Sequence, residues 1–346
     1  MNTVAIGSLF LLVPLLSAQA PEMKPAAELK RFERLIGNFT GKGTAVMEPG
    51  KPPIEWTCQA TYAWTLGNHF VSADTIVDFG SAMKPLAIRE LIGWDRESNR
   101  YVAIGVNNEG EGSLNEVVFP NDDTMVQIVT KKAGGAPCAE RQETTFTKDG
   151  MQFRITVLAA SGAPFECVTG TFTRATNLKP VAVEASAAME PAAEPVVKMT
   201  KAAGNYEVRG ELVMTPGTAA MKITGTDHCR PIFGGTVLQT STTGKADGST
   251  EIYQAESFLV WNKAKQCFDQ FGADNMGWIG AMEQRFIEGD KKILATCVAP
   301  YMGQMTTQRM VIDLDANGKF KKMLTMAMSG ASEPYCSFKA EYSPVK

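Results

Sequence analysis

Histidine is scarce in this chain, and basic residues do not outnumber acidic ones. Among 346 residues there are two histidines, His69 and His228, with 34 lysines and arginines against 37 aspartates and glutamates, so the formal net charge is -3. Because histidine is the commonest general acid or base, the chain has few residues suited to acid–base catalysis of the usual kind. A nucleic-acid partner is not expected either, since it normally requires a basic excess.

The sequence also lacks the short motifs of common catalytic and cofactor sites. It contains no Cys-x-x-Cys pair, no Gly-x-Ser-x-Gly elbow, no phosphate-binding Gly-x-x-x-x-Gly-Lys-Ser/Thr loop and no His-Glu-x-x-His. A zinc ribbon, a hydrolase triad, a nucleotide site and a zinc protease therefore have no local signature. The glycine-rich stretch 105–112 follows a strand pattern with no helix after it, which favours a hairpin end. We predict no catalytic residue, no metal site and no cofactor.

Long apolar runs are absent except near the N-terminus. The run from Val4 to Leu16 is followed by Ser17-Ala18-Gln19-Ala20, which fits the small-residue pattern at which secretory signal peptides are cleaved. We expect residues 1–20 to be a signal peptide, with cleavage after Ala18 as the alternative, and a secreted or periplasmic protein. The run is too short to span a bilayer comfortably, and no later segment has 18 consecutive apolar residues, so no membrane span is expected.

What the chain does have is an internal repeat with a fixed offset. Gly37-Asn38-Phe39 recurs as Gly204-Asn205-Tyr206, and Trp94 recurs as Trp261, each 167 residues later. The matches fall on residues that fix turns and anchor cores, which indicates two copies of one domain. We place copy 1 at residues 25–177 and copy 2 at residues 198–346. A Pro/Ala-rich linker at 178–197 joins them, and its composition predicts an extended, semi-rigid segment.

Within each copy the apolar pattern is that of β-strands. A helix is expected over residues 28–36, after which the period changes to two, as where Ile54, Trp56 and Cys58 alternate with polar residues. Nine or ten strands of this kind follow one another through short turns, which predicts an antiparallel meander. Because the open edges of a large sheet invite pairing with other chains, we predict an all-β fold of two tandem closed β-barrels, each preceded by a short helix.

Three landmarks of copy 1 resemble a known bacterial family. They are Gly37-Asn38-Phe39 after the leading helix, Gly93-Trp94-Asp95 before a hairpin, and the terminal Gly170-Thr171-Phe172-Thr173-Arg174. The chain resembles the bacterial domain of unknown function 1579, present as a tandem repeat, and is similar to the wider lipocalin-like or calycin-type barrels. The resemblance implies that Phe39 packs under Arg174 and closes the barrel floor. It implies no activity, and copy 2 departs from it in lacking the terminal arginine.

Metal and haem sites are not favoured by the residues present. The haem-binding nitrobindin-type barrels are a similar group that uses a histidine late in the barrel, whereas both histidines here come early in their copies, so the axial ligand is missing. In Asp227-His228-Cys229 the middle side chain faces the opposite side of a strand from its neighbours, so the three cannot bind one ion. Methionines near the end of copy 2 could bind Cu(I), but alternate positions such as Met326 and Met328 favour core filling.

If the protein is exported as expected, its seven cysteines can form disulfides, because thiols pair in an oxidising compartment. Cys138 and Cys167 lie in copy 1, and Cys297 and Cys336 lie in copy 2. One disulfide within each copy is an expectation, although connectivity is not deducible from sequence. The odd number leaves at least one thiol free or paired between chains.

Aromatic residues at inward-facing positions of copy 1 are the best candidates for ligand contact. They are Trp56, Tyr62, Trp64 and Trp94. Large aromatics with a polar tip line apolar pockets well, but they also fill cores. Asn107-Asn108 precedes a glycine turn, where this pair either orients a ligand at the barrel mouth or caps the turn.

Three functions remain open from the sequence. The first is an exported tandem lipocalin-like protein that binds a small, partly apolar ligand in the bore of copy 1, with copy 2 as a diverged partner. The second is a non-catalytic structural or interaction module whose bores are filled by side chains, and the third, less favoured, is an uncharacterised enzyme. A cavity of roughly a few hundred Å³ behind Trp56 and Trp64 would favour the first, and a filled bore the second. The oligomeric state is not determined by the sequence.

Overall fold

The computed structural model describes residues 24–133, 136–159, 162–213, 216–301, 304–329 and 333–345. The predicted signal peptide at residues 1–20 lies outside the described residues. No helix in the described ranges is long and apolar enough to cross a membrane.

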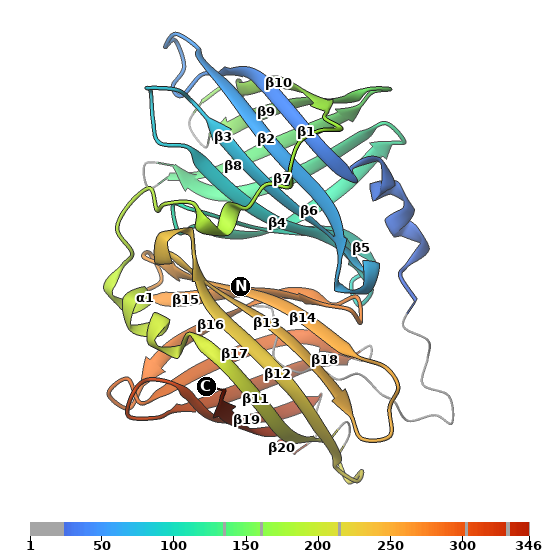
Figure 1. The fold of residues 1–346 in the computed structure, drawn as a ribbon, viewed down its shortest axis with the longest axis vertical. Coiled ribbons are helices and arrows are strands. Elements are labelled where there is room, and N and C mark those ends of the chain that lie inside the picture. The colour runs from blue at the N-terminus through green and yellow to red at the C-terminus, as the bar shows by residue number, and fades with distance from the viewer. Residues whose placement is uncertain are drawn as a thin grey trace.

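Copy 1 forms a closed antiparallel barrel of ten strands, which confirms the predicted fold (Figure 1). Neighbouring strands follow chain order, and the first strand closes the barrel by pairing with the second and the last. The strands are β1 (Gly37–Ala45), β2 (Ile54–Thr65), β3 (Phe70–Asp78), β4 (Leu86–Asp95), β5 (Arg100–Asn107), β6 (Gly112–Asn121), β7 (Thr124–Ala133), β8 (Ala136–Phe146), β9 (Gly150–Ala159) and β10 (Phe165–Arg174). The short helix before them, η1 (Ala27–Arg34), is a 3-10 helix.

Copy 2 repeats this barrel with the same strand order. Its strands are β11 (Gly204–Leu212), β12 (Met221–Ile232), β13 (Val237–Ala246), β14 (Tyr253–Asn262), β15 (Cys267–Asp274), β16 (Ile279–Ile287), β17 (Lys292–Tyr301), β18 (Gln304–Leu314), β19 (Phe320–Ser329) and β20 (Tyr335–Pro344). A short helix, α1 (Glu194–Met199), and the single turn η4 (Thr200–Ala202) precede them. Helix α1 therefore begins within the segment expected to be an extended linker.

The floor of copy 1 is closed as the resemblance implies. The Arg174 guanidinium carbon lies 4.9 Å from the centre of the Phe39 ring. Its two terminal nitrogens donate hydrogen bonds to the carbonyl oxygens of Ile36 and Arg34 at 2.7 and 2.6 Å, so the last strand is fixed to the end of η1. In copy 2, which lacks this arginine, the Tyr206 ring packs against Phe320 at 5.4 Å between ring centres.

The two barrels pack against each other through equivalent faces (Figure 1). One buried apolar cluster spans both copies, and many of its members are related by the 167-residue offset. The equivalent pairs include Leu66 with Phe233, Phe70 with Val237, Leu91 with Phe258, Ile104 with Phe271 and Val106 with Ala273. Strand β6 contacts β15 while its equivalent β16 contacts β5. The barrels are thus related by an approximate two-fold axis, as in an isologous dimer.

A charged cluster lies within this interface. The Arg89 guanidinium, 8% exposed, forms ion pairs with Asp74 of its own barrel at 2.6 Å and with Glu184 at 2.8 Å. Glu184 belongs to η3 (Val183–Ala185) of the connecting segment and also pairs with Arg230 of copy 2 at 3.2 Å. Glu256, which occupies in copy 2 the position of Arg89 in copy 1, lies 4.0 Å from it. One buried arginine therefore links both barrels and the segment between them.

Candidate functional site

The interior of copy 1 carries a band of polar residues, here called the polar belt. Its eight positions face inward by strand alternation and follow one another around the barrel from β2 to β8. The polar belt consists of Tyr62, Thr75, Glu90, Gly105, Ser113, Asn115, Gln127 and Gln142. Glycine is counted because Gly105 leaves open the space beside Glu90, whose Oε1 would lie 3.7 Å from a β-carbon there.

Hydrogen bonds and burial set the electrostatics of the polar belt. Gln127 Nε2 donates to Glu90 Oε1 at 3.1 Å, and Asn115 Nδ2 donates to Ser113 Oγ at 3.0 Å. Burial raises the pKa of Glu90, and the bond from Gln127 offsets only part of that rise. Burial also raises the pKa of Tyr62, with Glu90 nearby adding to the effect. The polar belt is therefore a partly desolvated acid surrounded by neutral hydrogen-bonding groups.

The equivalent positions of copy 2 show how the two bores differ. Six of the eight polar-belt residues, all except Asn115 and Gln127, remain partly exposed although they point into the barrel. All eight counterparts in copy 2 are buried. The counterparts are Cys229, Thr242, Ser257, Gly272, Gly280, Met282, Ala295 and Met310. The middle of the copy 1 bore is therefore less tightly filled by side chains than the middle of the copy 2 bore.

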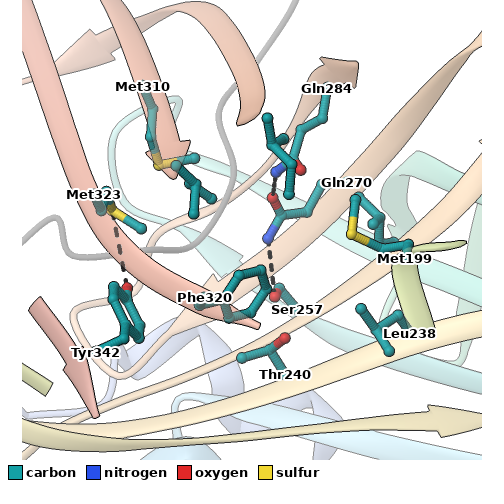
Figure 2. Close-up of a pocket in the computed structure, with 13 residues that line it drawn as sticks. Met199, Leu238, Thr240, Ser257, Gln270, Gln284, Met310, Phe320, Met323 and Tyr342 are labelled. Atoms are coloured by element: carbon teal, nitrogen blue, oxygen red, sulfur yellow. Dashed lines mark hydrogen bonds between the residues drawn. The ribbon is translucent and has the colours of Figure 1, made fainter. Parts of the chain in front are cut away.

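Side chains fill most of the copy 2 bore. A pocket of about 30 Å³ remains there, lined on one side by Met310, Met323 and Tyr342 (Figure 2). Figure 2 also shows a chain of hydrogen bonds across it, from Gln284 to Gln270 and from Gln270 to Ser257, the latter at 3.0 Å. A space of this size holds one or two water molecules and no larger ligand.

The end of each barrel opposite its leading helix, here called the mouth, is also more tightly filled in copy 2 than in copy 1. In copy 2, Asp274 accepts hydrogen bonds from the Trp278 backbone N–H at 3.2 Å and the Tyr253 hydroxyl at 3.3 Å, and all three residues are buried. This group places two large buried rings at the mouth of copy 2. At the positions equivalent to Trp278 and Tyr253, copy 1 has Glu111, which is exposed, and the smaller Leu86. The mouth of copy 1 therefore lacks the large indole ring that Trp278 provides in copy 2.

Trp56 lies on the inner wall of copy 1 between the polar belt and the mouth. Its ring is 6.0 Å from that of Phe172 between centres. A β-carbon at Gly170 or Gly43 would come within 2.2 or 2.7 Å of the indole, so both glycines make room for it. Trp56 is 4% exposed, yet its Nε1 has no hydrogen-bond partner within the described residues. A buried donor without an acceptor is costly, and an acceptor in the bore would satisfy it.

The other sequence candidates lie in different surroundings. Trp64 and Trp94 pack at the η1 end of the barrel, where the Trp94 ring is 4.7 Å from that of Tyr101. The Asn107 side chain accepts hydrogen bonds from the backbone of Glu109 and Glu111 in its own turn. Asn108 is buried, and its side chain binds the backbone of residues 85, 87 and 187. The structure thus brings Trp56 and Tyr62 to the accessible bore and gives the two asparagines bonds within the fold.

The sequence alone predicts neither Glu90 nor the glutamines Gln127 and Gln142 as site residues. A signal was present for the first of them, because Arg89-Glu90 interrupts an otherwise apolar strand from Leu86 to Trp94. Adjacent strand residues face opposite sides, so one of two charged neighbours must point into the barrel. The glutamines carry no comparable signal, since their facing depends on strand register.

The described residues include no disulfide and one group of side chains that could hold a metal ion. All seven cysteines carry free thiols. Strand β9 lies between Cys138 on β8 and Cys167 on β10, and two strands separate Cys297 from Cys336, so neither expected pair is within disulfide reach. Cys267, Asp269 and Glu283 come together on the copy 2 barrel. Lys265 already pairs with both of those carboxylates, at 2.9 and 3.0 Å.

Two buried carboxyls of copy 2 make its stability dependent on pH. Neither oxygen of Asp227 meets a hydrogen-bond partner among the described residues. Burial raises the pKa of Asp227 from 3.8 to about 7, which the nearby Thr242 offsets only in part. Burial likewise raises the pKa of Asp274 to about 7, despite the N–H groups of Trp278 and Met276. Between about pH 4 and about pH 7, the folded protein therefore keeps a proton on each of these two carboxyls, whereas the unfolded chain has lost both protons.

We therefore expect the free energy of unfolding to fall as pH rises from about 4 to about 7, by about 1.4 kcal/mol per pH unit for each carboxyl. The variant Asp227→Ala, which introduces the residue that copy 1 has at Ala60, should remove about half of that slope. Urea unfolding across this pH range measures it, with the exposed Asp247→Ala as control. An unchanged slope in Asp227→Ala would contradict the assignment.

Comparison with known proteins gives a family and no activity. Rv2717c from M. tuberculosis is similar over 44% of this chain and 99% of that chain, at 13% identity and a TM-score of 0.35. A protein of unknown function from the DUF3598 family of Nostoc punctiforme covers 92% of this chain and 100% of its own, at 9% identity and a TM-score of 0.27. No curated protein matches. The model of the family described as protein of unknown function (DUF1579) matches residues 24–174 and again residues 193–339. With one match on each barrel, the chain belongs to the DUF1579 family as a tandem repeat of its domain.

Proposed function

We propose that copy 1 binds a small, partly apolar molecule in its bore and that copy 2 is a filled, diverged partner. The observation that carries this proposal is a contrast in burial. Six of the eight residues of the polar belt in copy 1 are partly exposed, whereas all eight residues at the equivalent positions of copy 2 are buried. Closed barrels of this size hold one small ligand or fill the space with side chains. Under this proposal, one fold takes both forms in a single chain.

The charge of the polar belt determines which polar groups of a ligand would be complementary to it. Glu90 is its one ionisable acid, Tyr62 is neutral at physiological pH, and it contains no basic side chain. A carboxylate or phosphate ligand would meet Glu90 without a compensating cation, which is unfavourable in a desolvated site. A hydroxyl or amine group is complementary, because both donate hydrogen bonds to the Glu90 carboxyl oxygens.

The wall above the polar belt selects the rest of the ligand. Trp56 and Phe172 supply aromatic surface, and Ile88, which precedes Glu90 by two residues, is partly exposed on the same inner side. The unpartnered Trp56 N–H adds one donor for an ether, carbonyl or hydroxyl oxygen. We therefore assign a ligand with an apolar body, an alcohol or amine end, and no negative charge.

We further propose that the protein is exported, with residues 1–20 as a cleaved signal peptide. The apolar run from Val4 to Leu16 and the following small residues support this. N-terminal sequencing of the mature protein tests it, and a retained Met1 would contradict it.

Three probes of equal chain length test the ligand assignment: 1-octanol, octylamine and octanoate. We expect the first two to change the tryptophan fluorescence with saturation at pH 8, and octanoate to bind at least about tenfold more weakly because of repulsion by Glu90. The variant Glu90→Gln should bind octanoate and octylamine with similar affinity. Glu55→Gln, an exposed position on β2, is the matched control and should retain the preference.

The location of the probe is tested separately. Trp56→Phe should lose most of the fluorescence change while octylamine still binds, as measured by calorimetry. Equal binding of all three probes to the wild-type protein, or no binding of any, would contradict a ligand site at the polar belt.

A further inference from the structure

The connecting segment fills a groove at the seam between the barrels. Val183 is fully buried there, in the apolar cluster shared by both copies. Asn108 Nδ2 donates to the Ala187 carbonyl at 2.9 Å, and the Met189 N–H donates to the Asn108 carbonyl at 2.9 Å. Lys84 Nζ donates to the Met189 carbonyl at 2.8 Å. One asparagine and one lysine of copy 1 thus hold an extended piece of main chain.

Copy 2 adds the opposite wall of this groove. A β-carbon at Gly234 would lie 2.5 Å from the Ala188 nitrogen, so the connecting segment passes directly over that glycine. Gly234 has a φ of 62°, which a residue with a side chain rarely adopts. The small Ala188 and the glycine below it allow the close approach.

The approximate two-fold axis places an equivalent groove on the other side of the seam, and no part of the chain that the structure describes fills it as the connecting segment fills the first. This second groove has a volume of about 360 Å³. Its lining residues are Gly67, His69, Thr250, Glu251, Ile252, Gln254 and Asn275. Three of them are counterparts of residues that hold the connecting segment in the filled groove. Gly67 corresponds to Gly234, Asn275 to Asn108, and Glu251 to Lys84, each at the offset of 167 residues.

Asn275 is held in the same way as Asn108 but lacks the bonds to a connecting segment. Its Oδ1 accepts from the Gln254 N–H at 2.9 Å and its Nδ2 donates to the Ile252 carbonyl at 2.7 Å. Asn108 makes the same two bonds to residues 87 and 85. The second N–H of Asn275 Nδ2 and the Asn275 carbonyl have no partner among the described residues, although Asn275 is 6% exposed. Among the described residues, two groups that could bind main chain are therefore in place without a partner.

We propose that this second groove binds an extended peptide of a partner protein. The peptide presents a carbonyl to Asn275 Nδ2 and, two residues later, an N–H to the Asn275 carbonyl, with a small residue between them over Gly67. This is main-chain recognition of an extended strand, in which flanking side chains give specificity. Since Glu251 stands where Lys84 binds a carbonyl, the peptide carries a lysine or arginine near its C-terminal end.

Two labelled peptides test the proposal on the full chain by fluorescence anisotropy. One copies residues 184–190, acetyl-Glu-Ala-Ser-Ala-Ala-Met-Glu-amide, and the other ends in Lys in place of the last Glu. We expect saturable binding of the Lys peptide, at least about tenfold tighter than the Glu peptide, from one complementary charge pair and one repulsive pair. Saturating octylamine should not displace it, so this site and the bore are distinguished.

Two variants of the groove and one control variant test the proposal further. Glu251→Lys recreates the charge of the filled groove and should reverse the preference toward the Glu peptide, while Glu341→Lys, an exposed position on β20, should leave it unchanged. Asn275→Ala should weaken both peptides at least about tenfold by removing the side-chain donor. Failure of both peptides to bind the wild-type chain, or an unchanged preference in Glu251→Lys, would overturn the proposal.

Discussion

Replacing Trp278 by alanine is expected to lower the free energy of unfolding by about 3–5 kcal/mol, the usual cost of truncating a buried large aromatic side chain. Trp278 is 8% exposed and belongs to the main apolar cluster of copy 2. Its backbone N–H also donates to the buried Asp274 carboxyl. Chemical denaturation measures the loss, and Val197→Ala, at a side chain that is 53% exposed, should cost less than about 0.5 kcal/mol.

The same change should open the second bore. Cys297 is 3% exposed within that cluster, and burial raises its pKa to about 12, so the wild-type thiol should resist alkylation. In Trp278→Ala we expect iodoacetamide to modify Cys297 under conditions in which the wild-type protein is unmodified there, as measured by mass spectrometry of its peptide. An unmodified Cys297 in the folded variant would mean that Trp278 does not close the mouth.

Removing the guanidinium of Arg89 is expected to have an effect of similar size on the joint stability of the two barrels. Arg89→Ala leaves Asp74 and Glu184 without their shared partner inside the interface. Breaking one side of a buried ion pair costs about 3–5 kcal/mol, because the remaining charge stays buried and uncompensated. The loss should be smaller at low pH, where protonation of the carboxyls removes the unpaired charge.

The control for this prediction is Arg209→Ala, on an arginine that is exposed on β11 and pairs with the exposed Glu207 at 3.7 Å. We expect less than about 1 kcal/mol there, as for surface ion pairs in general. Denaturation of Arg89→Ala should also become less cooperative, since the two barrels lose part of their coupling. Equal losses in both variants would show that the interface charges do not hold the copies together.

The fold was predictable because the repeated residues are those that shape a barrel. The alternation from Ile54 to Trp64 predicts β2, and the spacing of turns predicts the meander. The resemblance correctly implied the packing of Phe39 under Arg174. Local sequence and strand period are sufficient for such features, because each concerns one strand or one pair of sequence neighbours.

The candidate site was only partly predictable, because it depends on distant pairing. Trp56 and Tyr62 stand out as large aromatics on an alternating strand, whereas Gln127 and Gln142 face each other only through the register of β7 with β8. The open mouth depends on what copy 1 lacks at Glu111, and this contrast emerges only when the buried Trp278 is seen in copy 2. Likewise, the sequence predicts a linker but not that it occupies one of two equivalent grooves.

A crystal structure of the protein soaked with octylamine tests the central claim most directly. We predict ligand density in the bore of copy 1, with the amine at Glu90 and the alkyl chain against Trp56, and none in copy 2, where about 30 Å³ is free. A copy 1 bore filled by its own side chains, or equal occupancy of both bores, would contradict the account.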